Sequence, residues 1–208
     1  MKRALICTFF LAAILLTGCA VKKTPAPVSG TAPTLDEVFA TRRSVRAYEP
    51  GRVITEAEIR ELLTAVQNAP SWANQQPTRY YVAIGQEKRE AVLELIGGNK
   101  NRVSDASALI VSTFETGKSG FFRGKAADAT GDLWGAHDNG LSDAYLVLKA
   151  RAMGFDTLIM GMRDADGLRN LFGIPANETV MAVIALGYRA KEPTMPNHRP
   201  LDEVVKFY

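Results

Sequence analysis

Segments with helical periodicity alternate with single apolar segments along this chain, and this alternation limits the folds open to it. Thr34 and Thr55 each open a capping box, in which Glu37 and Glu58 follow three residues later. The alternation is too irregular for a simple doubly wound sheet, so the pattern alone indicates an α+β or α/β fold. We expect helices after Thr34, from Thr55 to Pro70, and over 86–96, 138–153 and 164–172, and strands over 79–84, 108–113, 156–160 and 179–188.

Residues 117–135 do not fit this alternation. They are rich in glycine, phenylalanine and charged residues and show no clear period. We expect a mobile excursion there, before the helix over 138–153, which Gly154 should end. No internal repeat is found in the chain.

The N-terminal residues predict export and lipidation. Lys2 and Arg3 precede an uncharged apolar run over 4–16, which is too short to cross a bilayer as a helix. The run ends in the sequence LTGC, which resembles the bacterial lipobox, whose cysteine is acylated and begins the mature protein. We therefore expect a signal peptide over 1–18, a lipid on Cys19, a flexible tether over 19–33 and a folded domain over 34–208. The alternative is an ordinary secretory signal in which Cys19 is incidental.

Cysteine content and charge limit how the mature chain is held together and what it binds. Cys7 and Cys19 are the two cysteines, and Cys7 lies in the expected signal peptide, so the domain must be held by its apolar core rather than by a disulfide. Removing the signal with its two basic residues lowers the formal net charge from +3 to about +1. This small charge, without a basic stripe, argues against a nucleic-acid partner. His137 and His198 have no nearby ligand set, which argues against a metal site.

Two segments carry polar side chains suited to a ligand. Arg42, Ser44 and Arg46 alternate after the first expected helix, so an extended backbone would point all three the same way. Two guanidinium groups and a hydroxyl suit a phosphate, although a solvated basic turn is an alternative. The second segment, APSWANQQP at 69–77, places hydroxyl and amide groups in a proline-bounded loop between a helix and a strand.

The order and spacing of these two segments resemble the nitroreductase family of FMN proteins. That family has R-x-S-x-R/K after its first helix and A-P-S-x-x-N-x-Q-P after its second, and the resemblance extends from Thr34 to the C-terminus. It implies an α+β fold with a central, mainly antiparallel sheet flanked by helices, in a homodimer that binds FMN at the subunit interface. The chain departs from the family at Thr78, Met160 and Asn197, where an aromatic, an acidic residue or glycine, and a basic residue are usual.

The resemblance also implies roles for individual residues. Arg42, Ser44 and Arg46 would hold the FMN phosphate, ribityl chain and pyrimidine edge, with Arg43 contributing its backbone. We further expect the protein backbone at Met160 and Gly161 to lie against the flavin ring, Asn99 to make a polar contact with FMN, and Arg199 to pair with the phosphate. Pro70, Ser71 and Asn74 would reach the flavin of the partner subunit.

We therefore expect an FMN-dependent, NAD(P)H-linked oxidoreductase that reduces nitroaromatics, quinones or similar small acceptors. No side chain needs to act as a nucleophile, since the flavin supplies the chemistry. The expected export conflicts with NAD(P)H as the electron donor, because NAD(P)H is scarce outside the cytoplasm. A tethered flavin-binding protein without turnover, and a dehalogenase-like or flavin-fragmenting enzyme, stay open as alternatives. Because Ala20 and not aspartate follows Cys19, we expect the outer membrane rather than the inner.

Overall fold

A computed structural model of the chain describes residues 32–208, and residues 32–208 form one compact unit. The expected signal peptide, Cys19 and nearly all of the expected tether lie outside the described residues. No helix within residues 32–208 has the length and apolar character to cross a membrane.

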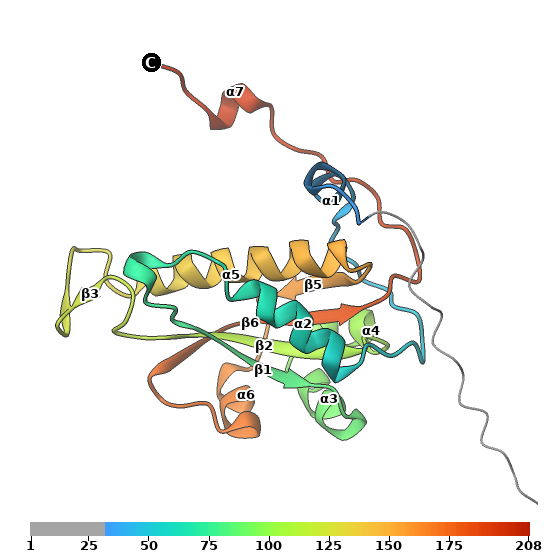
Figure 1. Ribbon diagram of the computed structural model, residues 1–208. Helices are drawn as coiled ribbons and strands as arrows, with labels where there is room; N and C mark the ends of the chain where they lie inside the picture. Colours follow the sequence, from blue (N-terminus) through green and yellow to red (C-terminus); the bar gives the residue numbers. More distant parts are fainter. Residues whose placement is uncertain (1–31) are drawn as a thin grey trace, which may run out of the picture. The chain divides into compact units, whose positions relative to one another are not determined.

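Four antiparallel strands form the central sheet of this unit, in the order β1-β2-β6-β5 (Figure 1). They are β1 (Thr78–Ala83), β2 (Ala108–Glu115), β5 (Asp156–Met160) and β6 (Glu178–Gly187). The strands predicted from the sequence are therefore confirmed to within a residue or two at each end. The central antiparallel sheet also confirms the α+β fold class that the family resemblance implied, where the pattern alone had left α/β open.

Helices cover both faces of the sheet (Figure 1). On one face lie α2 (Glu56–Val66) and the long helix α5 (Leu133–Ala152), and on the other lie α3 (Gln86–Leu93) and α6 (Ala165–Phe172). Neighbouring residues of β2 alternate between the faces, since Ile110 packs with α2 and α5 whereas Leu109 and Val111 pack on the opposite side. The sheet thus separates two apolar cores, each closed by its own helices.

The shorter elements complete the unit. Helix α1 (Leu35–Thr41) begins at the predicted capping box of Thr34, and α2 begins at that of Thr55. The remaining elements are the 3-10 turns η1 (Trp72–Asn74) and η2 (Gly97–Asn99), α4 (Lys100–Val103), β3 (Phe121–Phe122), β4 (Lys125–Ala126) and α7 (Leu201–Val204).

The structure corrects three expectations about these elements. The helix expected over 86–96 ends at Leu93, because the chain turns at Gly97, whose φ is +54°, into η2 and α4. The excursion over 117–135 contains the β3–β4 hairpin, and the indole nitrogen of Trp134 donates to Asp128 within it. Helix α5 begins at Leu133 rather than at the expected Asp138, and it ends before Gly154, whose φ is +82°.

Candidate functional site

The arginine-rich segment after α1 runs along the outer side of β5. Ser44 forms a parallel bridge with Thr157, and the backbone N–H of Val45 donates to the Thr157 carbonyl oxygen at 3.0 Å. Val45 is buried whereas Ser44 and Arg46 are exposed. The segment is therefore extended here, with Ser44 and Arg46 exposed on either side of the buried Val45.

Tyr48 fixes the end of this segment against the sheet. Its ring is buried and its hydroxyl donates to the Val45 carbonyl oxygen at 3.2 Å. The ring packs on Gly187 so closely that a Cβ on that glycine would lie 2.6 Å from Tyr48 Cδ1. Burial raises the pKa of the Tyr48 hydroxyl far above its ordinary value, with a smaller contribution from the charge of Asp156. Tyr48 is therefore a neutral anchor for the segment.

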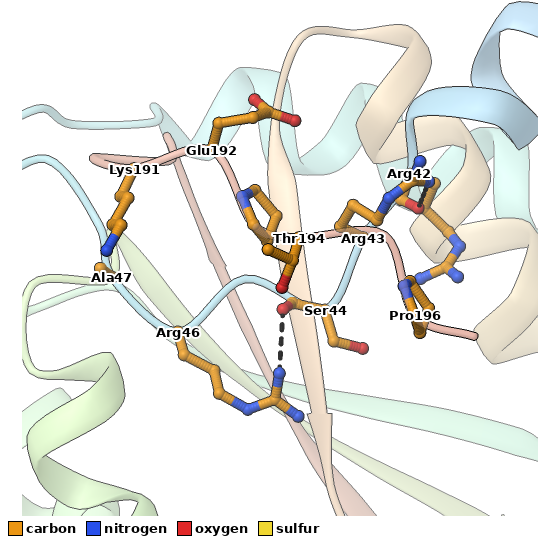
Figure 2. A pocket seen from close by; sticks show the side chains of 10 residues that line it. Arg42, Arg43, Ser44, Arg46, Ala47, Lys191, Glu192, Thr194 and Pro196 are labelled. Carbon is orange, nitrogen blue, oxygen red and sulfur yellow. Dashed lines mark hydrogen bonds between the residues drawn. The ribbon is translucent and has the colours of Figure 1, made fainter.

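A basic hollow of about 480 Å³ lies between this segment and the first part of the C-terminal tail (Figure 2). Figure 2 shows Arg46 and Lys191 on one side of Ser44, and Arg42 and Arg43 on the other. The tail contributes Lys191, Glu192, Pro193, Thr194 and Pro196 to the lining. The hollow is thus formed by two segments that are about 150 residues apart in the sequence.

The charges around this hollow are not equally available. The Arg43 guanidinium donates to the carbonyl oxygens of Ala40 and Arg42, so its N–H groups are used at the C-terminal end of α1. Glu192 accepts two hydrogen bonds from Arg189, and these bonds hold the pKa of its carboxyl below the ordinary value. Arg42, Arg46 and Lys191 have no ion-pair partner among residues 32–208. Arg46 does donate to the Ser44 carbonyl oxygen at 3.2 Å. Three cations without an ion-pair partner in the described part of the chain therefore line the hollow and suit an anion such as a phosphate.

A buried ion pair holds the tail in this position. Asp156, at the start of β5, accepts hydrogen bonds from the Arg189 side chain, with a Nε–Oδ2 distance of 2.9 Å. Arg189 also donates to the carbonyl oxygen of Thr41, and Arg151 of α5 donates to the hydroxyl of the same threonine. The bond to Asp156 raises the pKa of the Arg189 guanidinium above its ordinary value. The end of α1, the end of α5 and the root of the tail are therefore joined beside the basic hollow.

Two further predicted positions continue along β5. Met160 ends this strand, and its side chain is buried in the core, so only its backbone could face a ligand, as the resemblance implied. Gly161 follows and is exposed. The turn that holds Asn99 packs against the same segment, because a Cβ on Gly97 would lie 3.2 Å from Met162 Sδ. The side chain of Asn99 accepts a hydrogen bond from Arg102 at 3.3 Å.

Comparison with known proteins identifies the family of this chain. The nitroreductase family matches residues 39–188. An NADH dehydrogenase of Thermus thermophilus is 30% identical over 204 residues, which cover 86% of this chain and 98% of that protein. An oxygen-insensitive NAD(P)H nitroreductase of Salmonella typhimurium is 24% identical over 74% of this chain and 88% of its own length. The chain belongs to the nitroreductase family.

A solved structure supports the fold of this nitroreductase-family chain. A protein from Exiguobacterium sibiricum, solved in complex with FMN, aligns with a TM-score of 0.77. The alignment covers 86% of this chain and 99% of that protein, at 22% sequence identity. At this identity the likeness establishes the shared fold, in which helices flank a central antiparallel sheet.

The nitroreductase-type loop over 69–77 lies away from the basic hollow. The backbone N–H of Trp72 donates to Asp138 of α5 at 2.9 Å, whereas the end of α1, which leads into the arginine segment, meets α5 at Arg151 through Thr41. These two helix positions are about 20 Å apart along the axis, at 1.5 Å per residue. Pro70, Ser71 and Asn74 therefore do not join Arg42, Ser44 and Arg46 within one chain.

The tail differs from the expectation based on the family. Arg199 lies in its exposed part, just before α7, and is not among the residues that line the basic hollow. Its expected pairing with a phosphate stays a prediction. Lys191 and Thr194 line the hollow and were not predicted. Lys191 follows the last strand by only a few residues, and its charge was the one signal in the sequence that pointed to it.

Among residues 32–208, no group of three histidine, cysteine or acidic side chains is arranged to hold a metal ion. Trp134 packs edge-on against His137 in the first turns of α5, at 5.6 Å between ring centroids. The histidine ring also lies 3.4 Å from an oxygen of Asp138. His137 therefore has packing and hydrogen-bonding partners from its own helix.

Proposed function

We propose that this chain is an FMN-dependent oxidoreductase that reduces nitroaromatics, quinones or related small acceptors with electrons from NAD(P)H. The observation that carries the proposal is the basic hollow beside β5, where Arg42, Arg46 and Lys191 offer positive charge in a chain of the nitroreductase family. Relatives named NADH dehydrogenase and NAD(P)H nitroreductase, and a structural neighbour solved with FMN, support the same cofactor and donor.

The residues around the hollow fit the cofactor. Arg42 and Arg46 would bind the phosphate with the hydroxyl of Ser44, and Lys191 would add a third positive charge. The backbone at Met160 and Gly161 would lie along the ring system, where a backbone N–H favours the electron-rich reduced form. When bound, FMN supplies the hydride or electron transfer, so the protein needs to orient the ring and leave one face open to the acceptor.

We also infer that the complete site is formed by two copies of the chain. The loop over 69–77 contacts the first half of α5, and Thr41, directly before the arginine segment, contacts the second half. A two-fold axis across α5 would place the loop of one copy beside the arginine segment of the other, because such an interface is self-complementary. An apolar groove between α1, α2 and α5 supports this arrangement. Leu35, Phe39 and Tyr145, which line it, are 62%, 55% and 41% exposed.

The purified full-length chain tests the cofactor and the donor separately. We expect a yellow protein whose flavin absorbance is lost under anaerobic NADH or NADPH and returns when a quinone or nitroaromatic is added. A colourless protein that does not bind added FMN would contradict the cofactor assignment. A yellow protein that neither donor reduces would contradict the NAD(P)H-linked activity and favour a flavin-binding protein without turnover of that donor.

We propose, finally, that Cys19 is lipidated and that the domain is tethered to the bacterial outer membrane on its periplasmic face. The support is the LTGC sequence after a short apolar run, followed by Ala20 rather than aspartate. A Cys19→Ser variant should appear in the soluble periplasmic fraction, whereas the unaltered chain should sediment with outer membranes and incorporate labelled palmitate. Sedimentation of both forms with the membranes would contradict lipidation. If the tether is present, the donor must reach the protein in a compartment where NAD(P)H is scarce.

A further inference from the structure

The loop between α2 and β1 has an unusual backbone. Ala73, Asn74 and Gln76 have φ values of +45°, +56° and +48°, in the left-handed region that favours glycine. Three non-glycine residues in this region within four positions make the loop conformation unfavourable by itself. Such strain is kept only where the surroundings hold the backbone, and it is concentrated at functional sites.

Four hydrogen bonds form within the loop, and two of them join backbone groups: the N–H groups of Asn74 and Gln75 donate to the carbonyl oxygens of Ser71 and Trp72, each at 3.0 Å. The Ser71 hydroxyl accepts from the Gln76 N–H at 2.9 Å, and the Gln76 side chain donates to Asn74 Oδ1 at 2.9 Å. The side chains of Ala73 and Asn74 are exposed, so no apolar packing holds them. The internal bonds shape the turn, and contacts from outside the loop must fix its position against the rest of the chain.

Two consecutive buried residues of α5 lie beside the loop. Asp138 and Asn139 are each 1% exposed. Asp138 Oδ2 accepts from the Trp72 N–H at 2.9 Å, at the start of the strained stretch. Asn139 Nδ2 donates to the Ser112 hydroxyl and to the Thr113 carbonyl oxygen of β2, and lies 3.5 Å from the hydroxyl of Thr78, where the loop enters β1. Asp138 thus binds the start of the loop, whereas Asn139 binds β2 and only approaches Thr78, the residue at which the loop has ended.

Burial of the Asp138 side chain is energetically unfavourable unless hydrogen bonds compensate for the lost water. A carboxylate that is removed from water requires compensating hydrogen bonds or charges. Among the described residues its contacts are the Trp72 N–H and the ring of His137, which lies 3.4 Å from Oδ1. A hydrogen bond to an ionised acceptor is stronger than one between neutral groups, so this carboxylate restrains Trp72 more firmly than an amide would.

We propose that Asp138 is a positioning residue for the cofactor site: its carboxylate holds the strained 71–76 loop in the shape that presents Ser71 and Asn74 to the flavin. The proposal rests on the proposed function for its ligand, but the restraint on the loop is a property of the chain without cofactor. Asp138 itself need not touch the flavin, since it acts through the Trp72 backbone.

The test uses three variants of the full-length chain. Asp138→Ala removes the acceptor, and Asp138→Asn keeps an oxygen that accepts from Trp72 but loses the charge. Asp164→Ala is the matched control, because the Asp164 carboxylate also accepts from a backbone N–H, that of Gly167 at 2.9 Å, but caps α6 and has no contact with the loop. For each variant, the measurements are the Kd for FMN, the hydrogen-exchange rate of the Trp72 amide without FMN, and the visible circular dichroism of bound flavin.

We expect Asp138→Ala to raise the Kd for FMN by about tenfold or more and to speed exchange of the Trp72 amide by at least about tenfold. Asp138→Asn should restore the Kd to within about threefold of the unaltered chain, with a changed flavin dichroism. Asp164→Ala should change neither the Kd nor the exchange rate at Trp72. If Asp138→Ala fails to fold, Asp138→Ser, whose side chain is too short to reach Trp72, takes its place with the same expected results.

The outcomes separate this proposal from the proposed function. Unchanged FMN affinity in Asp138→Ala, or an equal loss in Asp164→Ala, would overturn the positioning role. A chain that binds no FMN in any form would contradict the proposed function. In that case, the Trp72 exchange still decides whether Asp138 holds the loop, since unchanged exchange in Asp138→Ala would overturn the restraint itself.

Discussion

At the scale of single residues, Arg42 gives the most direct test of the basic hollow. It has no ion-pair partner among residues 32–208, so its charge is available to a phosphate. We expect Arg42→Ala to raise the Kd for FMN by about ten- to a hundredfold, since a hydrogen bond to a charged group contributes roughly 1.5–3 kcal/mol. Fluorescence titration of the apoprotein measures this. Arg60→Ala is the control, because Arg60 pairs with Glu56 on the exposed side of α2. Unchanged affinity in Arg42→Ala would refute the assignment.

Arg199 is tested separately, because the structure and the family resemblance lead to different expectations for its contact with FMN. The resemblance predicts a contact with the phosphate, yet Arg199 lies in the exposed tail outside the basic hollow. If the tail reaches the phosphate when cofactor binds, Arg199→Ala should weaken FMN binding about tenfold, and Lys191→Ala by a similar factor. Loss of affinity in Lys191→Ala alone would assign the tail's contribution to Lys191 and reject the prediction for Arg199.

Asp143 predicts a pH dependence of stability. Its burial raises the pKa of this carboxyl to about 6, although hydrogen bonds from Ser112 and Tyr80 oppose the shift. The folded protein therefore binds this proton more tightly than the unfolded chain does. The resulting stability is fully present below about pH 4 and is lost as pH rises through about 6, with a change of about 3 kcal/mol. Urea unfolding of Asp143→Asn should lack this component. Parallel pH profiles for both proteins would contradict the shift.

At the scale of elements, the sequence predicted those helix starts and strands that depend on residues close together in the chain. Capping boxes at Thr34 and Thr55 predicted where α1 and α2 begin, and apolar runs predicted β5 and β6. Caps and side-chain alternation depend on near neighbours, so these signals were sufficient to find the four elements. The start of α5 was missed because Asp138 has the character of a cap residue, whereas its carboxylate accepts from a loop 66 residues away. The tail's part in the hollow was missed for the same reason, since it depends on the distant pair of Asp156 with Arg189.

Gly187, the last residue of β6, packs against Tyr48, which fixes the arginine segment. A methyl group added there would lie 2.6 Å from Tyr48 Cδ1 and 3.3 Å from the Ser107 backbone nitrogen, so Tyr48 would have to move. We expect Gly187→Ala to lower the free energy of unfolding by about 1–3 kcal/mol, as overpacking usually does. FMN binding should weaken too, because Tyr48 fixes the arginine segment. Gly98→Ala, where the added methyl meets nothing within 4 Å, is the control in both urea unfolding and FMN titration. Equal behaviour of the two variants would contradict the packing argument.

At the scale of the whole molecule, the separation along α5 of the two segments proposed to bind FMN predicts that cofactor binding depends on assembly. If two copies share the site, a charge placed in the apolar groove should abolish both. We expect Phe39→Glu to convert a dimer into a monomer, since Phe39 is 55% exposed in the chain alone and would be buried in the pair. Ile84→Glu is the control, because Ile84 is an exposed apolar residue outside the groove.

Sedimentation velocity and FMN titration on the same samples test this link. A monomeric Phe39→Glu chain should bind FMN at least about tenfold more weakly although its Arg42, Ser44 and Arg46 are unaltered, because it lacks the partner's Ser71 and Asn74. A monomer that binds FMN as tightly as the unaltered chain would show that one copy suffices, and the loop over 69–77 would then need another role. A variant that stays dimeric with full affinity would instead place the interface away from the groove between α1, α2 and α5.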